Sequence, residues 1–279
     1  MKSRNTLPDK ELQKIKSCPT RELCPLSDIC AKSHGDSNRL IYPKTLSVKR
    51  GDLLWTTHYA EDRVLVFKKG VFLSIGYSNQ EREVPFCLYG PGNSVGLSDM
   101  FTAEDIRSSY HVRTLLEGEV CSFSADVLRR ELGEYSDDYV HATVVSTLMS
   151  QCAGAFTLAM IKNQKSMTDR IVALLHCLRD FANRIDINQA EFNITHEDIA
   201  LVVGADRTTT TRALNKIVAD KVIERKYGKI KLLTERAEDP SSKQEYHTNF
   251  IQPKTNEAEE RDSKYRQVLP GLGAAFEMV

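Results

Sequence analysis

Short apolar segments separated by turn residues fill the first half of the chain. From about Leu40 to Phe123 they read LSVKRGDLLW, RVLVFKKGVFLSIGY, REVPFCLYGPGNSVG and VRTLLEGEVCSF, with glycines between and within them. Runs of Val, Leu, Phe and Tyr broken by glycine are typical of β-strands joined by turns. The pattern predicts a small barrel or sandwich-like β-domain over residues 39–125, in which YSNQER forms a hairpin tip.

From about Ser124 the apolar residues recur at steps of three and four. The segment from Tyr139 to Met160 carries one apolar stripe of that spacing, which predicts a long helix within residues 126–163. Such a stripe can pack on the β-domain or on a second copy of the helix. The candidate dimer-interface residues are Val140, Val144, Leu148, Cys152, Ala155 and Ala159. No uninterrupted apolar run approaches the roughly 18 residues of a membrane span.

The next segment, TDRIVALLHCLRDFANR, predicts a second helix with one apolar face. Beyond it, Thr195 and Asp198 have the spacing of a capping box, and Gly204 is a natural helix end. Asp206 can cap a further helix. VIERKYGKIKLL then predicts two strands joined by a tight turn. Helix, turn, helix and hairpin together predict a winged helix-turn-helix over residues 164–236.

Charge is balanced overall but unevenly distributed. The chain of 279 residues has a formal net charge of zero. From Arg207 to Lys231 there are eight Lys or Arg and two Asp or Glu, whereas from Glu235 to Asp262 there are four and eight. The basic block suggests a nucleic-acid surface. The polar, acidic segment 237–279 is expected to be mostly disordered.

The exposed face of the second motif helix carries residue types that bind DNA. Arginine can donate two hydrogen bonds to guanine O6 and N7, while threonine hydroxyls suit phosphates. The candidate DNA-binding residues are Arg207, Thr208, Thr211, Arg212 and Lys216, with Lys229 on the predicted wing. The alternative is a helical hairpin with a hydrated cationic surface. The turn glycine, the two caps, the outward arginines and the wing agree with one another and favour a DNA reader.

Composition narrows the class of protein further. The polar N-terminal segment MKSRNTLPDKELQKIK lacks the apolar core of a signal peptide, so a cytoplasmic protein that does not enter a membrane is expected. In a reducing cytosol, the seven cysteines are not expected to form structural disulfides. Neither a nucleophile–base pattern nor a P-loop stands out, so the protein is not expected to be an enzyme.

The order of elements over about residues 40–234, and above all EDIALVVGADRTTTTRALNKI, resembles the superfamily of the cyclic-AMP receptor protein and the fumarate–nitrate reduction regulator. In its pattern G-x-x-R-E-T-x-x-R, Arg207 and Arg212 stand at the arginine positions. Thr208 replaces the usual acidic residue, which accepts a hydrogen bond from cytosine. The resemblance implies an α+β fold with an N-terminal β-roll sensor domain like a cyclic-nucleotide-binding domain, a long dimerisation helix and a C-terminal winged helix-turn-helix.

The resemblance also implies partners and ligands. Family members are homodimers that bind inverted repeats in double-stranded DNA and usually contact RNA polymerase. Cyclic-nucleotide binders carry a Gly-Glu pair, and Leu97 stands where that Glu belongs, so a cyclic nucleotide is not expected. His58, His111 and His176 give no specific haem pattern.

Four cysteines form a candidate ligand set. In CPTRELCPLSDIC, five residues separate each cysteine from the next, and a further cysteine lies in the last predicted strand, just before the long helix. Four thiolates suit an iron–sulfur cluster. Oxygen-sensing members hold a [4Fe–4S] cluster with three N-terminal cysteines and one near the end of the β-roll, although their first two are usually separated by two residues. The ligands that the resemblance implies are Cys18, Cys24, Cys30 and Cys121.

Other roles stay open for these cysteines. A thiol switch needs two of them, a zinc site would use Cys24, Cys30 and His34, and unrelated thiols on an N-terminal arm, residues 1–38, need no ligand. The remaining cysteines lie in strand and helix patterns and are predicted to be buried fillers: Cys87, Cys152 and Cys177.

The sequence thus predicts a cytoplasmic, homodimeric transcription regulator that responds to oxygen or redox state through a [4Fe–4S] cluster. The alternative is a regulator on the same scaffold whose β-domain binds a small organic effector, with the cysteines as a thiol switch or without a role. A further class, a subunit or adaptor of an enzyme gated by a cyclic nucleotide, would need a catalytic segment, and the acidic tail is too short and featureless to supply one.

Overall fold

The structure of the protein, a computed structural model, describes residues 18–31, 43–56, 63–101, 110–185 and 191–233. These ranges contain an antiparallel β-domain, a long helix and a C-terminal domain of short helices and a small sheet. The α+β class is therefore confirmed. The predicted tail 237–279, His34 and His58 lie outside the described residues.

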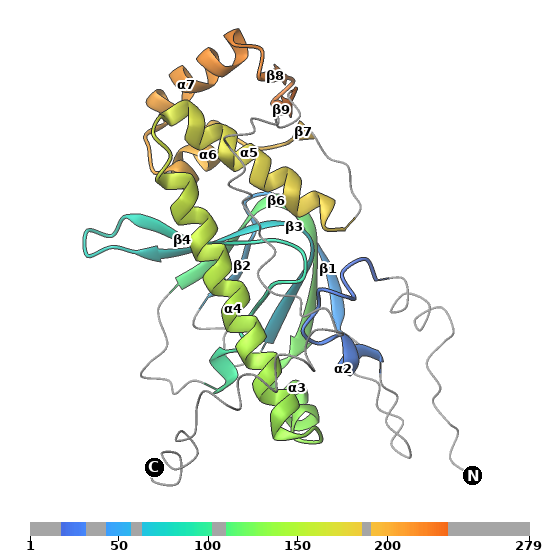
Figure 1. Cartoon of the computed structure of the whole chain (residues 1–279). Coiled ribbons are helices and arrows are strands. Elements are labelled where there is room, and N and C mark those ends of the chain that lie inside the picture. The colour runs from blue at the N-terminus through green and yellow to red at the C-terminus, as the bar shows by residue number, and fades with distance from the viewer. Residues whose placement is uncertain (1–17, 32–42, 57–62, 102–109, 186–190, 234–279) are drawn as a thin grey trace, which may run out of the picture. The chain divides into compact units, whose positions relative to one another are not determined.

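One antiparallel sheet forms the β-domain, in the order β1-β6-β3-β4, with β2 paired to β6 and β5 paired to β3. Figure 1 shows this sheet curled into a roll, with the long strands β3 and β6 side by side. In its core the rings of Phe67 and Phe72 stack with 4.1 Å between centroids. The strands are β1 (Lys44–Val48), β2 (Leu53–Thr56), β3 (Arg63–Tyr77), β4 (Glu83–Tyr89), β5 (Ser94–Val95) and β6 (Tyr110–Ser124).

Two short helical segments belong to this part of the chain and were not predicted. They are α2 (Ser27–Ala31) and the 3-10 helix η2 (Asp99–Phe101). Five residues in α2 are too few for a hydrophobic period to be read from the sequence, so the helix depends on packing against the roll.

Two helices follow the roll, α3 (Ala125–Leu132) and α4 (Asp137–Lys162). The sequence did not predict α3 as a helix of its own. Because α3 and a short loop lie between β6 and α4, the prediction that Cys121 directly precedes the long helix is wrong. The Ser136 side chain caps α4 by accepting a hydrogen bond from the backbone N–H of Tyr139 at 3.4 Å.

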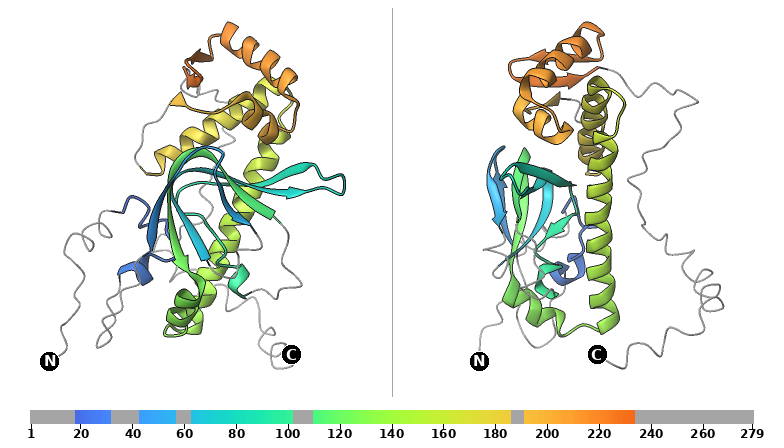
Figure 2. Two further views of the ribbon diagram at one scale, coloured as in Figure 1. Left: turned by 180° about the vertical axis from the view of Figure 1, so that it is seen from behind. Right: turned by 90° about the vertical axis from the view of Figure 1, so that its left-hand side faces the viewer.

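The long helix α4 lies against strand β4, and the right-hand view in Figure 2 shows it running beside the roll. Its approach depends on Gly154, because a Cβ atom there would meet the carbonyl oxygen of Leu88 and the sulfur of Cys87. The thiol of Cys87 donates to the carbonyl oxygen of Gln151 at 3.3 Å. A residue without a side chain therefore sets the distance between helix and sheet.

The solvent-facing side of α4 only partly matches the predicted stripe. Of the predicted residues, Leu148, Cys152 and Ala159 are exposed, and the other three, Val140, Val144 and Ala155, are half-buried. The exposed apolar positions recur at steps of four and three, which is the spacing of a coiled-coil seam: Val145, Met149, Cys152, Phe156 and Ala159.

Among the described residues, α4 is the one helix that by length and composition could also cross a membrane, with a mean hydropathy of 1.6 over 18 residues, of which 22% are buried. The segment nevertheless contains no long uninterrupted apolar run, because Ser, Thr and Gln interrupt the stripe. The apolar, exposed character of α4 fits a helix whose second neighbour is another protein surface.

Two of the three cysteines predicted as fillers are buried, Cys87 and Cys177. The third prediction is wrong, because Cys152 is exposed. It lies on the face of α4 that points away from the sheet, whereas the buried face includes Gly154 and Leu158.

The C-terminal domain has the predicted order of elements plus one short strand. Strand β7 pairs with β9, and β9 pairs with β8, so the wing hairpin belongs to a three-stranded sheet. The elements are α5 (Met167–Asn183), β7 (Glu191–Phe192), α6 (His196–Val203), α7 (Arg207–Ala219), β8 (Ile223–Lys226) and β9 (Lys229–Leu232).

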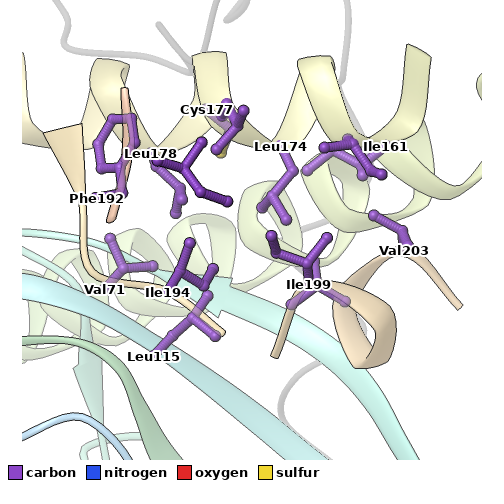
Figure 3. Packing of buried hydrophobic residues seen from close by; sticks show 14 of the residues in the cluster. Val71, Leu115, Ile161, Leu174, Cys177, Leu178, Phe192, Ile194, Ile199 and Val203 are labelled. Atoms are coloured by element: carbon purple, nitrogen blue, oxygen red, sulfur yellow. The ribbon is translucent and has the colours of Figure 1, made fainter. Parts of the chain in front are cut away.

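A continuous hydrophobic cluster joins this domain to the roll. Figure 3 shows Leu174 and Leu178 of α5 gathered with Ile199 of α6, beside Val71 and Leu115 of the sheet. These five side chains are at most 2% exposed. Burying apolar surface of this kind contributes about 25 cal/mol per Å². The helix-turn-helix is therefore packed on the roll and on α4 rather than attached by a linker alone.

Candidate DNA-binding surface and cysteine cluster

The helix-turn-helix is built by the caps that the sequence predicts. The Thr195 hydroxyl accepts from the N–H of Asp198 at 3.1 Å, while the Asp198 carboxylate accepts from the N–H of Thr195 at 3.3 Å. Helix α6 ends at Gly204 in the left-handed conformation, with φ of 71°, which a glycine adopts without strain. Asp206 then caps α7 by accepting from the N–H of Thr209 at 2.8 Å.

The face of α7 opposite its core presents the predicted reader residues. Thr210, Ala213, Leu214 and Ile217 are buried. Four of the predicted DNA-binding residues of this helix are exposed and Thr211 is half-buried: Arg207, Thr208, Arg212 and Lys216 are the exposed ones. The structure thus brings the predicted reader residues to one surface of α7.

Two acidic side chains hold cations of this surface. Oε1 of Glu197 lies 3.3 Å from Nη1 of Arg207, and both side chains are 70% exposed. Lys229 on the wing lies 2.8 Å from the carboxylate of Glu191 on β7. Each carboxylate occupies the kind of position that a DNA phosphate could take.

The tip of the wing projects a tyrosine. Tyr227 and Gly228 both have positive φ, of 51° and 77°, as in the tight turn of a type I′ hairpin. The Tyr227 side chain is 92% exposed, and the ammonium of Lys226 lies 5.5 Å from its ring centroid.

A hollow of about 620 Å³ lies between the wing, the starts of α6 and α7, and the turn after β1. The start of α6 contributes His196 and Glu197 to its lining, and the other elements contribute five cationic side chains: Arg50, Arg207, Arg225, Lys226 and Lys229. Arg50 comes from the β-roll and donates to Oδ2 of Asp198 at 3.0 Å. A cationic hollow beside a reader helix suits the sugar–phosphate backbone of DNA.

Reasoning from the sequence missed three polar side chains of this surface: His196, Glu197 and Arg225. Arg225 stood within the basic block, so its charge was visible. Its partners on α6 and α7 were not, because they depend on how the wing folds back onto those helices.

The four candidate cysteine ligands come together from two distant segments. Burial is the main cause that raises the pKa of Cys24 to about 12. A hydrogen bond from the N–H of Leu26 lowers this pKa, whereas the nearby Cys121 and Cys18 raise it. Burial also raises the pKa of Cys30, as do Cys24, Cys121 and Cys18. Each of these thiols thus lies within electrostatic reach of the others.

The segment that carries the first cysteines is anchored in a core of its own. Leu26 and Ile29 are buried with Leu128 and Leu132 of α3, and Cys24, Cys30 and Cys121 pack against the same cluster. Tyr139, at the start of α4, also borders it and stacks on Tyr135 with 4.5 Å between ring centroids. The cysteines therefore adjoin α3 and the first turn of α4.

Within the described ranges, no three His, Cys, Asp or Glu side chains converge on a point where one metal ion would sit. A single zinc ion needs such convergence. The four cysteines of a [4Fe–4S] cluster instead surround a larger group. The zinc prediction stays untested, since His34 lies outside these ranges.

The comparisons with known proteins agree with this geometry. Residues 169–237 match the family model of the Crp-like helix-turn-helix domain. This segment is therefore similar to a Crp-like helix-turn-helix domain. Helix-turn-helix domains bind DNA, which agrees with the DNA-binding surface predicted from the sequence. No curated protein sequence matches the chain.

Solved structures of CRP and CRP/FNR regulators share the fold at low sequence identity. A CRP/FNR-family regulator from Eubacterium rectale is 17% identical, with a TM-score of 0.55, covering 77% of this chain and 96% of its own. A CRP-family regulator from Thermus thermophilus is 15% identical, with a TM-score of 0.53, covering 68% and 92%.

The c-di-GMP-responsive global regulator CLP of Xanthomonas campestris is 18% identical to the chain. Its TM-score is 0.52, and the match covers 70% of this chain and 95% of that one. These likenesses show that the chain shares the fold of CRP and CRP/FNR regulators, and the matched segment adds the likeness to a Crp-like helix-turn-helix domain.

Proposed function

We propose that the protein is a homodimeric, cytoplasmic transcription regulator that binds an inverted repeat in double-stranded DNA, contacts RNA polymerase and responds to oxygen or redox state through a [4Fe–4S] cluster. The Crp-like domain with Arg207 and Arg212 exposed on α7 carries the DNA-binding part. The electrostatic proximity of Cys18, Cys24, Cys30 and Cys121 supports the sensing part.

The chemistry of the four thiols fits such a group. Burial raises the pKa of Cys24, Cys30 and Cys121, and close negative charges would repel one another unless a cationic group lies between them. Lys68 lies near Cys18 and Cys121 and forms an ion pair of 3.1 Å with Glu119. When bound, the cluster supplies a redox centre whose state depends on oxidants.

The same pKa values argue against a simple thiol switch. The thiolate is the reactive form of cysteine, and reactive cysteines have a lowered pKa. Burial raises the pKa of Cys24 to about 12, so little thiolate forms there at neutral pH. A ligand set that becomes deprotonated only when iron binds agrees better with this environment.

The position of the cysteines links sensing to assembly. Leu26 and Ile29 hold the cysteine segment against α3, and Tyr139 at the start of α4 borders the same core. A change in how this segment is held therefore acts at the end of the helix whose exposed apolar face we assign to the dimer. Dimer formation in turn sets the spacing of two reader helices on DNA.

The experiment is anaerobic purification of the full chain, followed by iron and sulfide analysis, an absorbance spectrum and binding to DNA selected from random duplexes. The native protein should contain about four irons per chain and select a two-fold symmetric sequence. Cys121→Ser should lose both iron and tight DNA binding, whereas the control Cys177→Ser, a buried cysteine of α5, should keep both. Native protein without iron would exclude the cluster but leave DNA binding intact as a separate result.

A further inference from the structure

Arg225, on strand β8 of the wing, bridges the two helices of the reader. Its Nη2 donates to Oδ1 of Asn215 on α7 at 2.6 Å, and its Nη1 lies 3.4 Å from Nε2 of His196 at the start of α6. The Arg225 side chain is half-buried and lines the cationic hollow. One wing residue thus contacts both helices at the candidate DNA surface.

The bridge fixes which end of the Asn215 amide is free. A guanidinium group carries five N–H donors and no acceptor, so only the carbonyl oxygen of the amide can face Arg225 at 2.6 Å. The amide NH₂ group must then point away from the wing. Asn215 is exposed, and it follows Arg207 and Thr211 at steps of four on α7, so all three share one face.

A second set of hydrogen bonds fixes His196. The Thr211 hydroxyl donates its single hydrogen to the carbonyl oxygen of Arg207 at 2.8 Å. The contact of 3.0 Å between Thr211 Oγ1 and His196 Nδ1 therefore needs a hydrogen on Nδ1. In the neutral ring, Nε2 then carries a lone pair directed at Arg225. Neutral His196 thus accepts from Nη1 of Arg225, while Asn215 accepts from its Nη2.

We propose that Arg225 is a specificity-determining residue of the DNA reader that acts through Asn215. By binding the amide oxygen, it makes Asn215 present a hydrogen-bond donor to DNA. In the major groove, guanine and thymine offer acceptors at O6, N7 and O4, whereas cytosine offers only the donor N4–H₂. Arg225 therefore makes the contacted position reject cytosine. This inference rests on the proposed DNA-binding function.

The test uses the sequence that the native full-length protein selects from random duplexes. Binding is then measured to that duplex and to all single-base variants of one half-site. Arg225→Ala frees the amide to turn its oxygen toward DNA, so rejection of cytosine should fall about ten-fold at one position. Asn215→Ala should remove the same preference, and the double variant should lose no more than Asn215→Ala alone.

Two further variants separate orientation from charge. Arg225→Lys keeps a group that can only donate, so it should retain most of the discrimination against cytosine. Lys226→Ala removes a neighbouring exposed charge of the wing and should weaken binding to all duplexes alike. Arg225→Ala could instead behave like Lys226→Ala and leave the base preference unchanged at every position. The proposal would then be wrong, and Arg225 would contact only the sugar–phosphate backbone of the DNA.

A measurement without DNA tests the bridge itself. Thermal unfolding of the native protein, Arg225→Ala, Asn215→Ala and the double variant should show non-additive losses, because each single variant breaks the same hydrogen bond. Additive losses of stability would show that Arg225 and Asn215 do not interact, and this would overturn the proposal. Native protein that selects no DNA sequence would instead contradict the proposed function, and this inference with it.

Discussion

Glu197 and Arg207 form an ion pair between the two helices of the reader, with 3.3 Å between Oε1 and Nη1. Arg207 is the first residue of α7, in the turn that meets base edges in helix-turn-helix complexes. In the free protein the Glu197 carboxylate therefore binds the Arg207 guanidinium group that would contact DNA. DNA has to displace this carboxylate when it binds.

Replacing Glu197 by Gln should consequently tighten DNA binding. An exposed pair of this kind contributes about 0.2–1 kcal/mol, so the dissociation constant should fall by about 1.4- to five-fold for selected and unrelated duplexes alike. Fluorescence anisotropy at one fixed salt concentration measures it. Glu134→Gln removes a carboxylate from the exposed loop after α3 and should change nothing; weaker binding by Glu197→Gln would mean that Glu197 itself contacts DNA.

Replacing Arg212 and replacing Lys229 by Ala should change DNA binding in different ways. Arg212→Ala should lose about 1–3 kcal/mol per half-site at one base pair and relax the selected sequence there. Lys229→Ala should weaken every duplex and reduce the dependence of binding on salt, because it removes a phosphate contact. Titrations at several salt concentrations on matched and mismatched duplexes distinguish them. If Arg212→Ala still discriminated fully between matched and mismatched duplexes, α7 would not be the helix that recognises the DNA sequence.

The exposed face of α4 should carry the dimer. Leu148 is 43% exposed and lies beside the seam of Val145 and Met149, so Leu148→Asp should leave each subunit folded but place a charge in the apolar contact. Sedimentation should show monomers, and DNA affinity should drop with them. Gln80→Asp adds the same charge at the exposed tip between β3 and β4 and should stay dimeric. A Leu148→Asp dimer of native strength would exclude this seam.

Acid should destabilise the reader through His196. Burial, and then Arg225 and Arg207, lower the pKa of His196 below its usual 6.5. The unfolded chain therefore binds the proton more readily than the folded one, so the free energy of unfolding falls as pH drops below about 6.5 and is unaffected by this group above it. Glu197, the next residue on α6, also pairs with Arg207 and does not reverse this sign.

The check is the melting temperature of the native protein and of His196→Asn from about pH 7.5 to about pH 5.5. Asn has no proton to gain, so the variant should lose less stability on acidification. Burial also lowers the pKa of His111, despite Glu83. His111 is present in both proteins, and the difference between their pH profiles isolates His196. Parallel profiles would show that His196 does not titrate in this range.

Local patterns in the sequence were enough for the helix-turn-helix. The capping box of Thr195 and Asp198, the end at Gly204 and the buried face of α7 all appear as predicted. They depend on contacts within a few residues, so spacing alone specifies them. The long strands β3 and β6 followed from runs of Val, Leu, Phe and Tyr broken by glycine, and the long helix α4 followed from apolar steps of three and four.

Which helix faces are buried and which side chains contact one another could be seen only in the tertiary structure. The stripe predicted on α4 was only partly exposed, and Cys152 faces solvent, because Gly154 turns the helix toward β4 and thereby decides which side is buried. Neither the five-residue α2 nor the bridge from Arg225 to Asn215 leaves a periodic signal, since each arises where segments distant in sequence meet. The four cysteines could be listed from the sequence, but their approach depends on α3 and the roll holding Leu26 and Ile29. Sequence determined the elements through short-range contacts, and tertiary packing decided which side chains meet.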